Sequence, residues 1–230
     1  MRAELVAATA LRNTRPAGGT DAEAVIAHAA TALRNTRPAG GTDAEAVIAH
    51  AAMSSHDAET VLRRLIDDDR TDLLAHASAT LHVYGVSRAA AEIIRAHPGF
   101  AVSLRDDDGA VVPHLIAEDE DLVNLFDTAI EHIAFIRQEL LDGLEHVLVD
   151  DPNLLSRRKR AAEAARLLQP LATATQLVIT GSYGAWRGFV EKHSGKYEDK
   201  EIRMIARACL DVLQPEAPLV FEDLAAGERR

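Results

Sequence analysis

The chain has 230 residues, and 47% of them are hydrophobic, which is enough for one or two domains with a sizeable core and excludes a disordered chain. Lys and Arg number 25 against 36 Asp and Glu, and the formal net charge of −11 argues against binding to a nucleic acid polymer or an anionic membrane. The single cysteine, Cys209, excludes an internal disulfide and a cysteine-rich zinc site. Because no apolar run is typical of a signal peptide or a membrane span, we expect a cytoplasmic protein.

A segment near the N-terminus is repeated without a single change. Residues 7–30 recur as residues 29–52, a period of 22. Structural repeats diverge in sequence, and a solenoid needs about three copies, so the pattern favours a recent duplication over a functional array. We therefore expect a duplicated N-terminal arm over residues 1–41, flexible or forming an extra helix, followed by one domain over residues 42–230.

Hydrophobic periodicity predicts mostly helices. They are expected over residues 44–53, 57–66, 88–96, 120–148, 154–168, 184–192 and 199–213. Alternating residues from His76 to Tyr84 predict a strand that places His76 and His82 on one face. Further strands are expected over residues 100–105 and 175–180, with a turn at 106–109 that makes a hairpin with 110–113. Because the strands are few and non-consecutive, the expected class is α+β, a helix-rich domain with a small mixed sheet and long helices.

Positive charge is concentrated in the predicted helix 154–168. Arg157, Arg158, Lys159 and Arg160 form a run that is typical of a solvated helix face. Arg166 follows between apolar residues, toward the end of the helix that we expect to be more buried. Its guanidinium suits bidentate binding of a phosphate, although a solvated position would explain it as well.

Two further stretches are candidates for a site. The strand-to-helix junction at residues 180–189 offers glycines and helix-start amides to an anion, but its spacing matches neither the Rossmann fold nor the P-loop. Arg95, His97, Ser103 and Arg105 flank a predicted helix break, which a purely structural role also explains. The ten histidines lack metal-ligand spacing, so no metal site is predicted, and Cys209 is expected to be a packed residue.

The order of several segments resembles the flavin-dependent thymidylate synthases (ThyX). They are HASATLHVYGVSR at 76–88, the basic helix ending in Arg166, LVITGSYGAWRGF at 177–189, EIR at 201–203 and APLVF at 217–221. The resemblance covers residues 42–224, so that 42–230 would be the catalytic domain. It implies homotetramers of α+β subunits that bind FAD and methylate C5 of dUMP, with methylenetetrahydrofolate as one-carbon donor and NADPH as reductant.

The family signature, Arg-His-Arg followed by Ser-x-Arg, is degenerate in this chain. One alignment pairs Arg95 with the first signature arginine and Ser103-Leu104-Arg105 with Ser-x-Arg, whereas an ungapped one pairs His97 with the signature histidine. Either alignment leaves at least one signature arginine missing. The resemblance assigns Ser103, Arg105, Arg166 and His193 to the nucleotide, with Ser103 and His193 as catalytic residues.

The same resemblance assigns His76, Arg88, Arg95, His97 and Ser182 to the flavin. At position 182 the family has an asparagine, at Gly184 an arginine, and at His193 an arginine against the uracil. A histidine can still donate a hydrogen bond to a pyrimidine carbonyl, but its charge near neutral pH is conditional, and Lys192 beside it is an alternative cation.

The leading interpretation is flavin-dependent C5-methylation of a uracil nucleotide. The substrate would be dUMP or UMP, the latter as in relatives that serve nucleoside-antibiotic biosynthesis. The alternative is a non-catalytic relative that keeps the fold as a nucleotide-binding or assembly module, because the signature is broken. Both readings imply small-molecule partners, nucleotide and folate, and no nucleic acid polymer or membrane.

Overall fold

The computed structural model describes residues 1–8, 42–52, 57–68 and 70–225. The chain divides into two compact units. The first comprises residues 1–84, 93–104 and 177–230, and the second comprises residues 85–92 and 105–176. The first copy of the repeat, apart from its first two residues, lies outside the described residues, as does most of the predicted arm 1–41.

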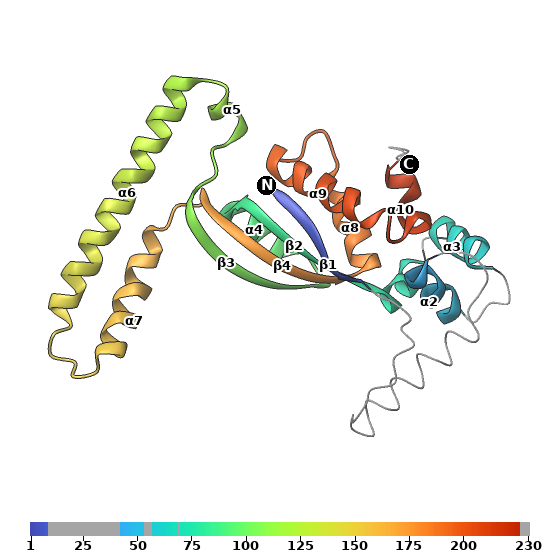
Figure 1. Ribbon diagram of the computed structural model, residues 1–230, viewed down its shortest axis with the longest axis horizontal. Coiled ribbons are helices and arrows are strands. Elements are labelled where there is room, and N and C mark those ends of the chain that lie inside the picture. Colours follow the sequence, from blue (N-terminus) through green and yellow to red (C-terminus); the bar gives the residue numbers. More distant parts are fainter. Residues whose placement is uncertain (9–41, 53–56, 69, 226–230) are drawn as a thin grey trace. The chain divides into compact units, whose positions relative to one another are not determined.

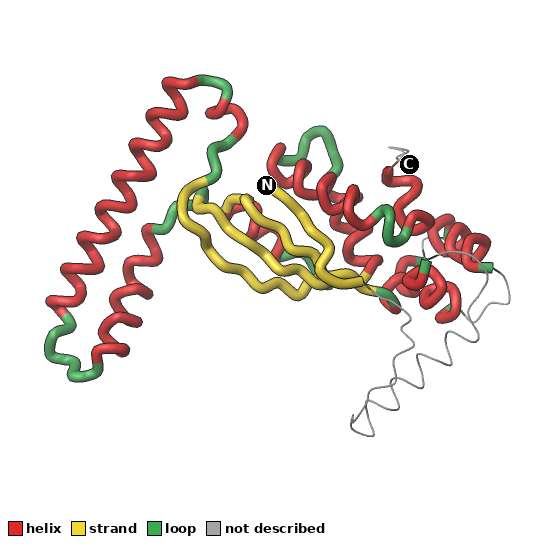
Figure 2. The backbone as a smooth tube through the Cα atoms, viewed as in Figure 1, coloured by secondary structure: helices red, strands yellow, loops and turns green. Residues whose placement is uncertain are grey.

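A four-stranded sheet runs through the chain in the order β1-β2-β4-β3 (Figure 1, Figure 2). Its strands are β1 (Arg2–Ala8), β2 (Ser78–Ser87), β3 (Phe100–Ala110) and β4 (Thr173–Ser182). β1 pairs antiparallel with β2, with Arg2 opposite Tyr84 and Ala8 opposite Ala79. In β2 the residues Leu81 and Val83 are buried and alternate with more exposed neighbours, as the period of two requires.

The helices of the first unit pack against one another, and two of them contact the sheet. They are α2 (Asp43–Ala51), α3 (Ala58–Asp67), η1 (Thr71–His76), α8 (Tyr183–His193), α9 (Lys200–Leu213) and α10 (Pro218–Ala225). α9 packs against β1, and the α8 residue Trp186 donates its indole N–H to the Ala79 carbonyl on β2 at 3.1 Å. Cys209 is fully buried on α9, where burial raises the pKa of its thiol to about 12. The prediction of a packed cysteine is confirmed.

Several helices begin at side-chain caps that are visible in the sequence. Thr42 and Glu45 form a reciprocal capping box at α2. Asp57, Ser182 and Asp199 cap α3, α8 and α9. α4 (Arg88–Arg95) follows β2 directly. Each cap accepts amide hydrogens that the first turn of a helix leaves without an intrahelical partner.

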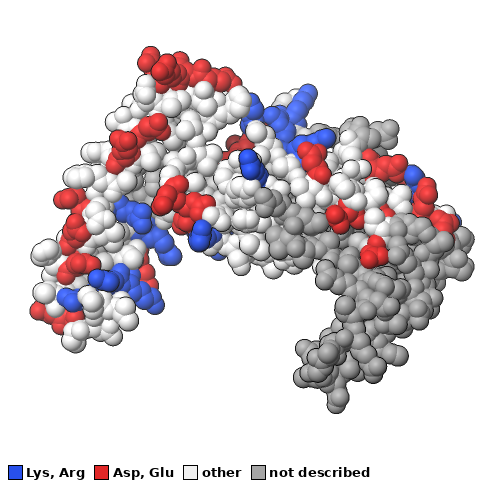
Figure 3. Space-filling model, in the orientation of Figure 1, with Lys and Arg blue, Asp and Glu red and all other residues white. Residues whose placement is uncertain are grey.

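The second unit is dominated by two helices, α6 (Glu120–Val147) and α7 (Leu154–Ala165), which pack against each other (Figure 1). α5 (His114–Ala117) precedes them, and η2 (Arg166–Leu168) follows. Hydrophobic periodicity predicted the long helix, yet no residue of α6 is buried. Leu122, Leu125 and Phe135 are among its exposed apolar side chains. Acidic side chains gather over the start of α6, at residues 118–121 (Figure 3).

The α+β class is confirmed, but two local predictions are wrong. Residues 106–109 do not turn back into a hairpin, because β3 continues to Ala110. Asp106 and Asp107 lie within that strand and accept hydrogen bonds from Arg88 and Gln176, which a sharp turn would not allow. His76 belongs to η1 and precedes β2, so it does not share a strand face with His82. Within the described ranges no helix is long and apolar enough to cross a membrane.

Candidate functional site

Two of the predicted site residues, His97 and His193, meet in an aromatic cluster of the first unit. Their ring centroids are 6.4 Å apart. Phe189, one turn before His193 on α8, has its ring centroid 4.9 Å from that of His193 and 5.4 Å from that of His97. Phe100 stands 4.7 Å from His97 and 4.4 Å from Trp186. The cluster therefore joins the turn between α4 and β3 to the inner face of α8.

The junction between β4 and α8 explains why these rings approach so closely. A Cβ atom on Gly181 would lie 2.6 Å from the Phe100 ring, so a larger residue cannot occupy this position without displacing it. Ser182 accepts the Ala185 amide hydrogen at 3.1 Å and fixes the first turn of α8. The hydroxyl that the resemblance assigns to the flavin thus serves as the helix cap in this structure.

The two histidines differ in their polar surroundings. Nε2 of His97 lies 3.2 Å from the Ala185 carbonyl oxygen. Burial lowers the pKa of His97, and the Ala185 contact opposes this only in part. His193 is only 3% exposed, and neither of its ring nitrogens has a hydrogen-bond partner among the residues described. Buried polar atoms without partners are rare and call for an explanation.

The remaining predicted residues of the first unit lie on other elements. His76 is exposed at the end of η1, Arg95 is exposed at the end of α4, and Ser103 is exposed on β3. Lys192, the alternative cation, is exposed on α8 beside the buried His193. The structure therefore brings His97 and His193 together and leaves His76, Arg95 and Ser103 on the surface of the unit.

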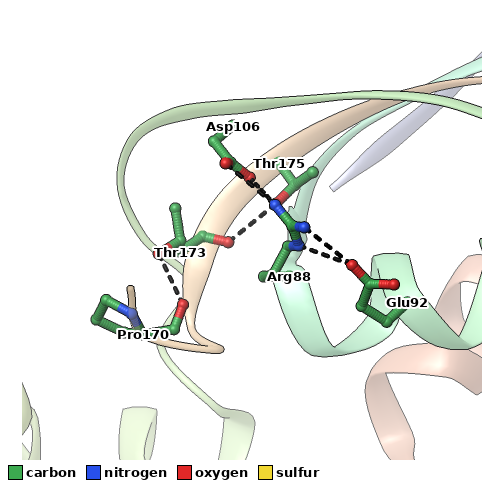
Figure 4. Close-up of polar contacts among 6 residues, drawn as sticks. All are labelled: Arg88, Glu92, Asp106, Pro170, Thr173 and Thr175. Atoms are coloured by element: carbon green, nitrogen blue, oxygen red, sulfur yellow. Dashed lines mark hydrogen bonds and ion pairs between the residues drawn. The ribbon is translucent and has the colours of Figure 1, made fainter. Parts of the chain in front are cut away.

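In the second unit, Arg88 is held between two carboxylates (Figure 4). It donates to Asp106 at 2.8 and 3.1 Å and to Glu92 at 3.0 Å. The hydrogen bond to Asp106 is the main reason why the pKa of Arg88 is raised. Thr175 donates to the Thr173 carbonyl on the neighbouring strand β4 (Figure 4). Two carboxylates already neutralise Arg88, which leaves it little capacity for a cofactor phosphate.

The other two predicted site arginines of the second unit are accessible. Arg105 is 77% exposed in its side chain and lies 3.4 Å from Asp107. Arg166 is exposed where α7 passes into η2, while its neighbour Ala165 is buried. The expectation that Arg166 lies at a more buried end of its helix is wrong, because Arg166, Leu167 and Leu168 at that end are all exposed.

Sequence reasoning missed two functional contacts. The Glu198 carboxylate oxygen Oε2 lies 3.3 Å from Nδ1 of His193, with a turn and no regular helical spacing between the two residues. Asp106 neutralises Arg88 from 18 positions away, which no local pattern shows. Only the Arg88–Glu92 ion pair could have been predicted from the sequence, because its residues lie four positions apart on one helix.

A small sheet with capped helices, in which the half-buried His97 meets the buried His193, belongs to a class that comparison with known proteins identifies. The family model described as "Thymidylate synthase complementing protein" matches residues 17–219. A protein of Corynebacterium efficiens is 38% identical over 169 residues, which cover 70% of this chain and 68% of the relative. Proteins of Corynebacterium glutamicum and Mycobacterium tuberculosis are 39% and 37% identical, with the same coverage.

All three relatives bear the name flavin-dependent thymidylate synthase. The chain belongs to the flavin-dependent thymidylate synthase family, and the resemblance found in its sequence is confirmed.

Proposed function

We propose that the protein is a flavin-dependent methyltransferase that adds a one-carbon unit to C5 of a uracil nucleotide, dUMP or UMP. Family membership supports the reaction class. The single observation that carries the site assignment is His193, a buried side chain whose two ring nitrogens lack hydrogen-bond partners in the described structure. A pyrimidine carbonyl would supply the missing partner.

The residues present fit such ligands in part. In the first unit, His193 and the nearby aromatic faces suit a planar base. In the second unit, Arg105 and Arg166 are each exposed, and each suits a phosphate group by itself. His76, Arg95, His97 and Ser182 remain assigned to FAD, with Ser103 beside Arg105 assigned to the nucleotide. Arg88 fits least, since Asp106 and Glu92 already occupy it.

Bound flavin and methylenetetrahydrofolate would supply the hydride and one-carbon chemistry, with NADPH as the proposed reductant. The chain's own contribution is to orient the base and to polarise it. His193 would donate a hydrogen bond to a pyrimidine carbonyl, which stabilises negative charge on that oxygen when C5 reacts. His97, in contact with Phe100, would pack against the flavin side of the site.

A test of this proposal begins with the visible spectrum of the purified protein. We expect flavin absorbance and a C5-methylated product from UMP or dUMP when FAD, methylenetetrahydrofolate and NADPH are supplied. Arg166→Ala should weaken nucleotide binding roughly ten- to a hundredfold, because a charged hydrogen bond is lost. The exposed Arg158 on α7, the helix that ends just before Arg166, provides the control, and Arg158→Ala should bind as the wild type does. No flavin absorbance together with no methylated product would refute the proposal.

A second candidate function rests on Arg88 and Ser182. Both side chains are engaged inside the chain, one with two carboxylates and the other as a helix cap. A relative that has lost flavin binding would act as a nucleotide-binding or assembly module. Calorimetry separates the two functions, since the second predicts binding of UMP or dUMP without binding of FAD.

We further propose that the protein assembles as a homotetramer in the cytoplasm. The apolar side chains of α6 support assembly, because Leu122, Leu125, Phe135 and Leu140 are all exposed and no α6 residue is buried. Light scattering of the purified protein gives its mass directly. A preference for UMP over dUMP in the assay above would favour a role in nucleoside-antibiotic biosynthesis.

A further inference from the structure

The helix α2 is built entirely from the second copy of the N-terminal repeat. Its N-cap Thr42, its helical residues 43–51 and its C-cap Ala52 all lie within residues 29–52. Residues 20–30 lie outside the described ranges, and their sequence is that of residues 42–52, position by position. The chain therefore contains two segments of identical sequence for one helix position.

The apolar contacts of α2 define what this helix position requires of its occupant. Ala44, Ala46, Ile48 and Ala49 are buried. α2 packs against α3 (Figure 1) and against η1, both of which belong to the first unit. The same four side chains recur 22 positions earlier in the chain, with the same spacing. The first copy therefore presents an identical apolar face.

Glu45 is the polar anchor of the same position. It is fully buried, and its carboxylate oxygens accept the amide hydrogens of Thr42 and of Leu219 on α10, each at 2.7 Å. The Thr42 hydroxyl accepts the Glu45 amide hydrogen in return, at 3.4 Å. The first copy carries the same pair as Thr20 and Glu23. It therefore contains every α2 side chain that these contacts use.

The match to the family also includes both copies. The family model covers residues 17–219, so the match begins inside the first copy, three positions before Thr20. The helix in the structure comes from the second copy. Within the repeat, the sequence offers no residue by which the fold could prefer one copy to the other.

The connections on either side of α2 are what distinguishes the two copies. With the second copy in place, residues 9–41 join β1 to α2 and residues 53–56 join α2 to α3. With the first copy in place, residues 9–19 and 31–56 would make these connections. The entropic cost of closing a loop grows only with the logarithm of its length, so these lengths favour the second copy by only about threefold.

We propose that the α2 position is filled by either copy of the repeat, so that the native protein is a mixture of two arrangements. Residues 42–52 are the major occupant and residues 20–30 the minor one, in a ratio of about three to one. The surface that receives the helix, on α3, η1 and α10, is the same in both arrangements. A substitution in one copy is then buffered by the other copy.

The experiment places one substitution in the full chain and in a shortened chain without residues 7–28, which has a single copy. In the shortened chain, Glu45→Ala removes both accepted hydrogen bonds, and the unfolding equilibrium constant from urea denaturation should rise about thirtyfold or more. In the full chain, the same substitution should raise this constant only about fourfold, because the first copy takes the position.

Two further variants and one control complete the comparison. Glu23→Ala alone should have no measurable effect, because it removes only the minor arrangement. Glu23→Ala combined with Glu45→Ala should restore the full loss seen in the shortened chain. Arg187→Met changes a contact outside the repeat and should have the same effect at both chain lengths.

Isoleucine methyl resonances in NMR spectra identify the copy that is in place. Ile48 is fully buried in α2, and Ile26 is its counterpart in the first copy. In the Glu45→Ala protein, adding Ile26→Val should remove the resonance of the buried isoleucine, whereas adding Ile48→Val should leave it. In the Glu23→Ala protein the two substitutions should exchange these effects.

Equal losses from Glu45→Ala at the two chain lengths would overturn the proposal, because the first copy would then not replace the second. So would an Ile26→Val substitution that leaves the spectrum of the Glu45→Ala protein unchanged. A rescue that disappears on dilution would place the first copy in a second molecule and would overturn exchange within one chain. Should Glu45→Ala fail to fold in the shortened chain, Glu45→Gln, which keeps one acceptor oxygen, allows the same comparison.

Discussion

Substitution of Arg187 by methionine tests how α10 is attached to the first unit. Arg187 is 8% exposed on α8 and donates to the Val220 carbonyl and to Asp223 Oδ1, each at 2.7 Å, with a second bond to Oδ2. Methionine keeps the length of the side chain but leaves the carboxylate and the carbonyl without their donor. The change therefore isolates the polar contacts from the packing.

The expected loss in unfolding free energy follows from how deeply the Arg187 and Asp223 side chains are buried. Breaking a buried ion pair costs about 3–5 kcal/mol, but the Asp223 side chain is 38% exposed, and solvent screening reduces the loss to about 2–3 kcal/mol. For a chain of this size the unfolding midpoint should fall by about 5–10 °C. Arg207→Met is the matched control, since the Arg207–Asp211 pair on α9 is exposed on both sides and should contribute nothing measurable.

The pH dependence of this loss has a defined sign. Burial alone would raise the pKa of Asp223, but the hydrogen bonds and charge of Arg187 outweigh it and lower the pKa. A lowered folded-state pKa stabilises the fold above the ordinary value of about 4 and ceases to do so in acid. Thermal unfolding followed by circular dichroism should show the difference between wild type and Arg187→Met narrowing below pH 4. If the unfolding midpoint of Arg187→Met at pH 7 equalled that of Arg207→Met, the reasoning would be refuted.

Two further predictions concern α2. Deleting residues 7–28 removes one period of the repeat, and the sequence at the new junction is identical to the original one. The thermal unfolding midpoint should therefore not change. A fall of several degrees would mean that the first copy contributes to the fold. In that shortened chain, Glu45→Ala removes a fully buried carboxylate that accepts the Thr42 and Leu219 amide hydrogens at 2.7 Å each. Loss of both contacts should cost about 2–4 kcal/mol, and a midpoint unaffected by the substitution would contradict this role.

Local pattern was sufficient where an element depends on its own residues. The long helix α6 and the helix α9 were predicted nearly to their ends, because apolar periodicity and a capping aspartate specify them within the segment. The packed state of Cys209 followed from the same periodicity. β1 and α10 were missed, since each is short and depends on partners far along the chain, β2 for β1 and α3 and α8 for α10.

Contacts between distant residues account for the predictions that failed. The run Asp106-Asp107-Asp108-Gly109 is typical of a turn, but Arg88 and Gln176 provide partners that keep it in β3. His193 was recognised as a site residue from the resemblance alone. Its burial and the approach of Glu198 became visible only in the fold, because a turn sets their distance.

The sequence by itself determined the family, the helix-rich α+β class, the acidic character and the residues available for a nucleotide site. The tertiary structure decided which of those residues are already satisfied. In the folded chain, Arg88 is paired with two carboxylates and Ser182 caps a helix. Arg166 is exposed, and His193 is buried beside Glu198. The reason is physical: helix propensity and periodicity act between near neighbours, whereas desolvation and charge pairing depend on distances in space that the order of residues does not contain.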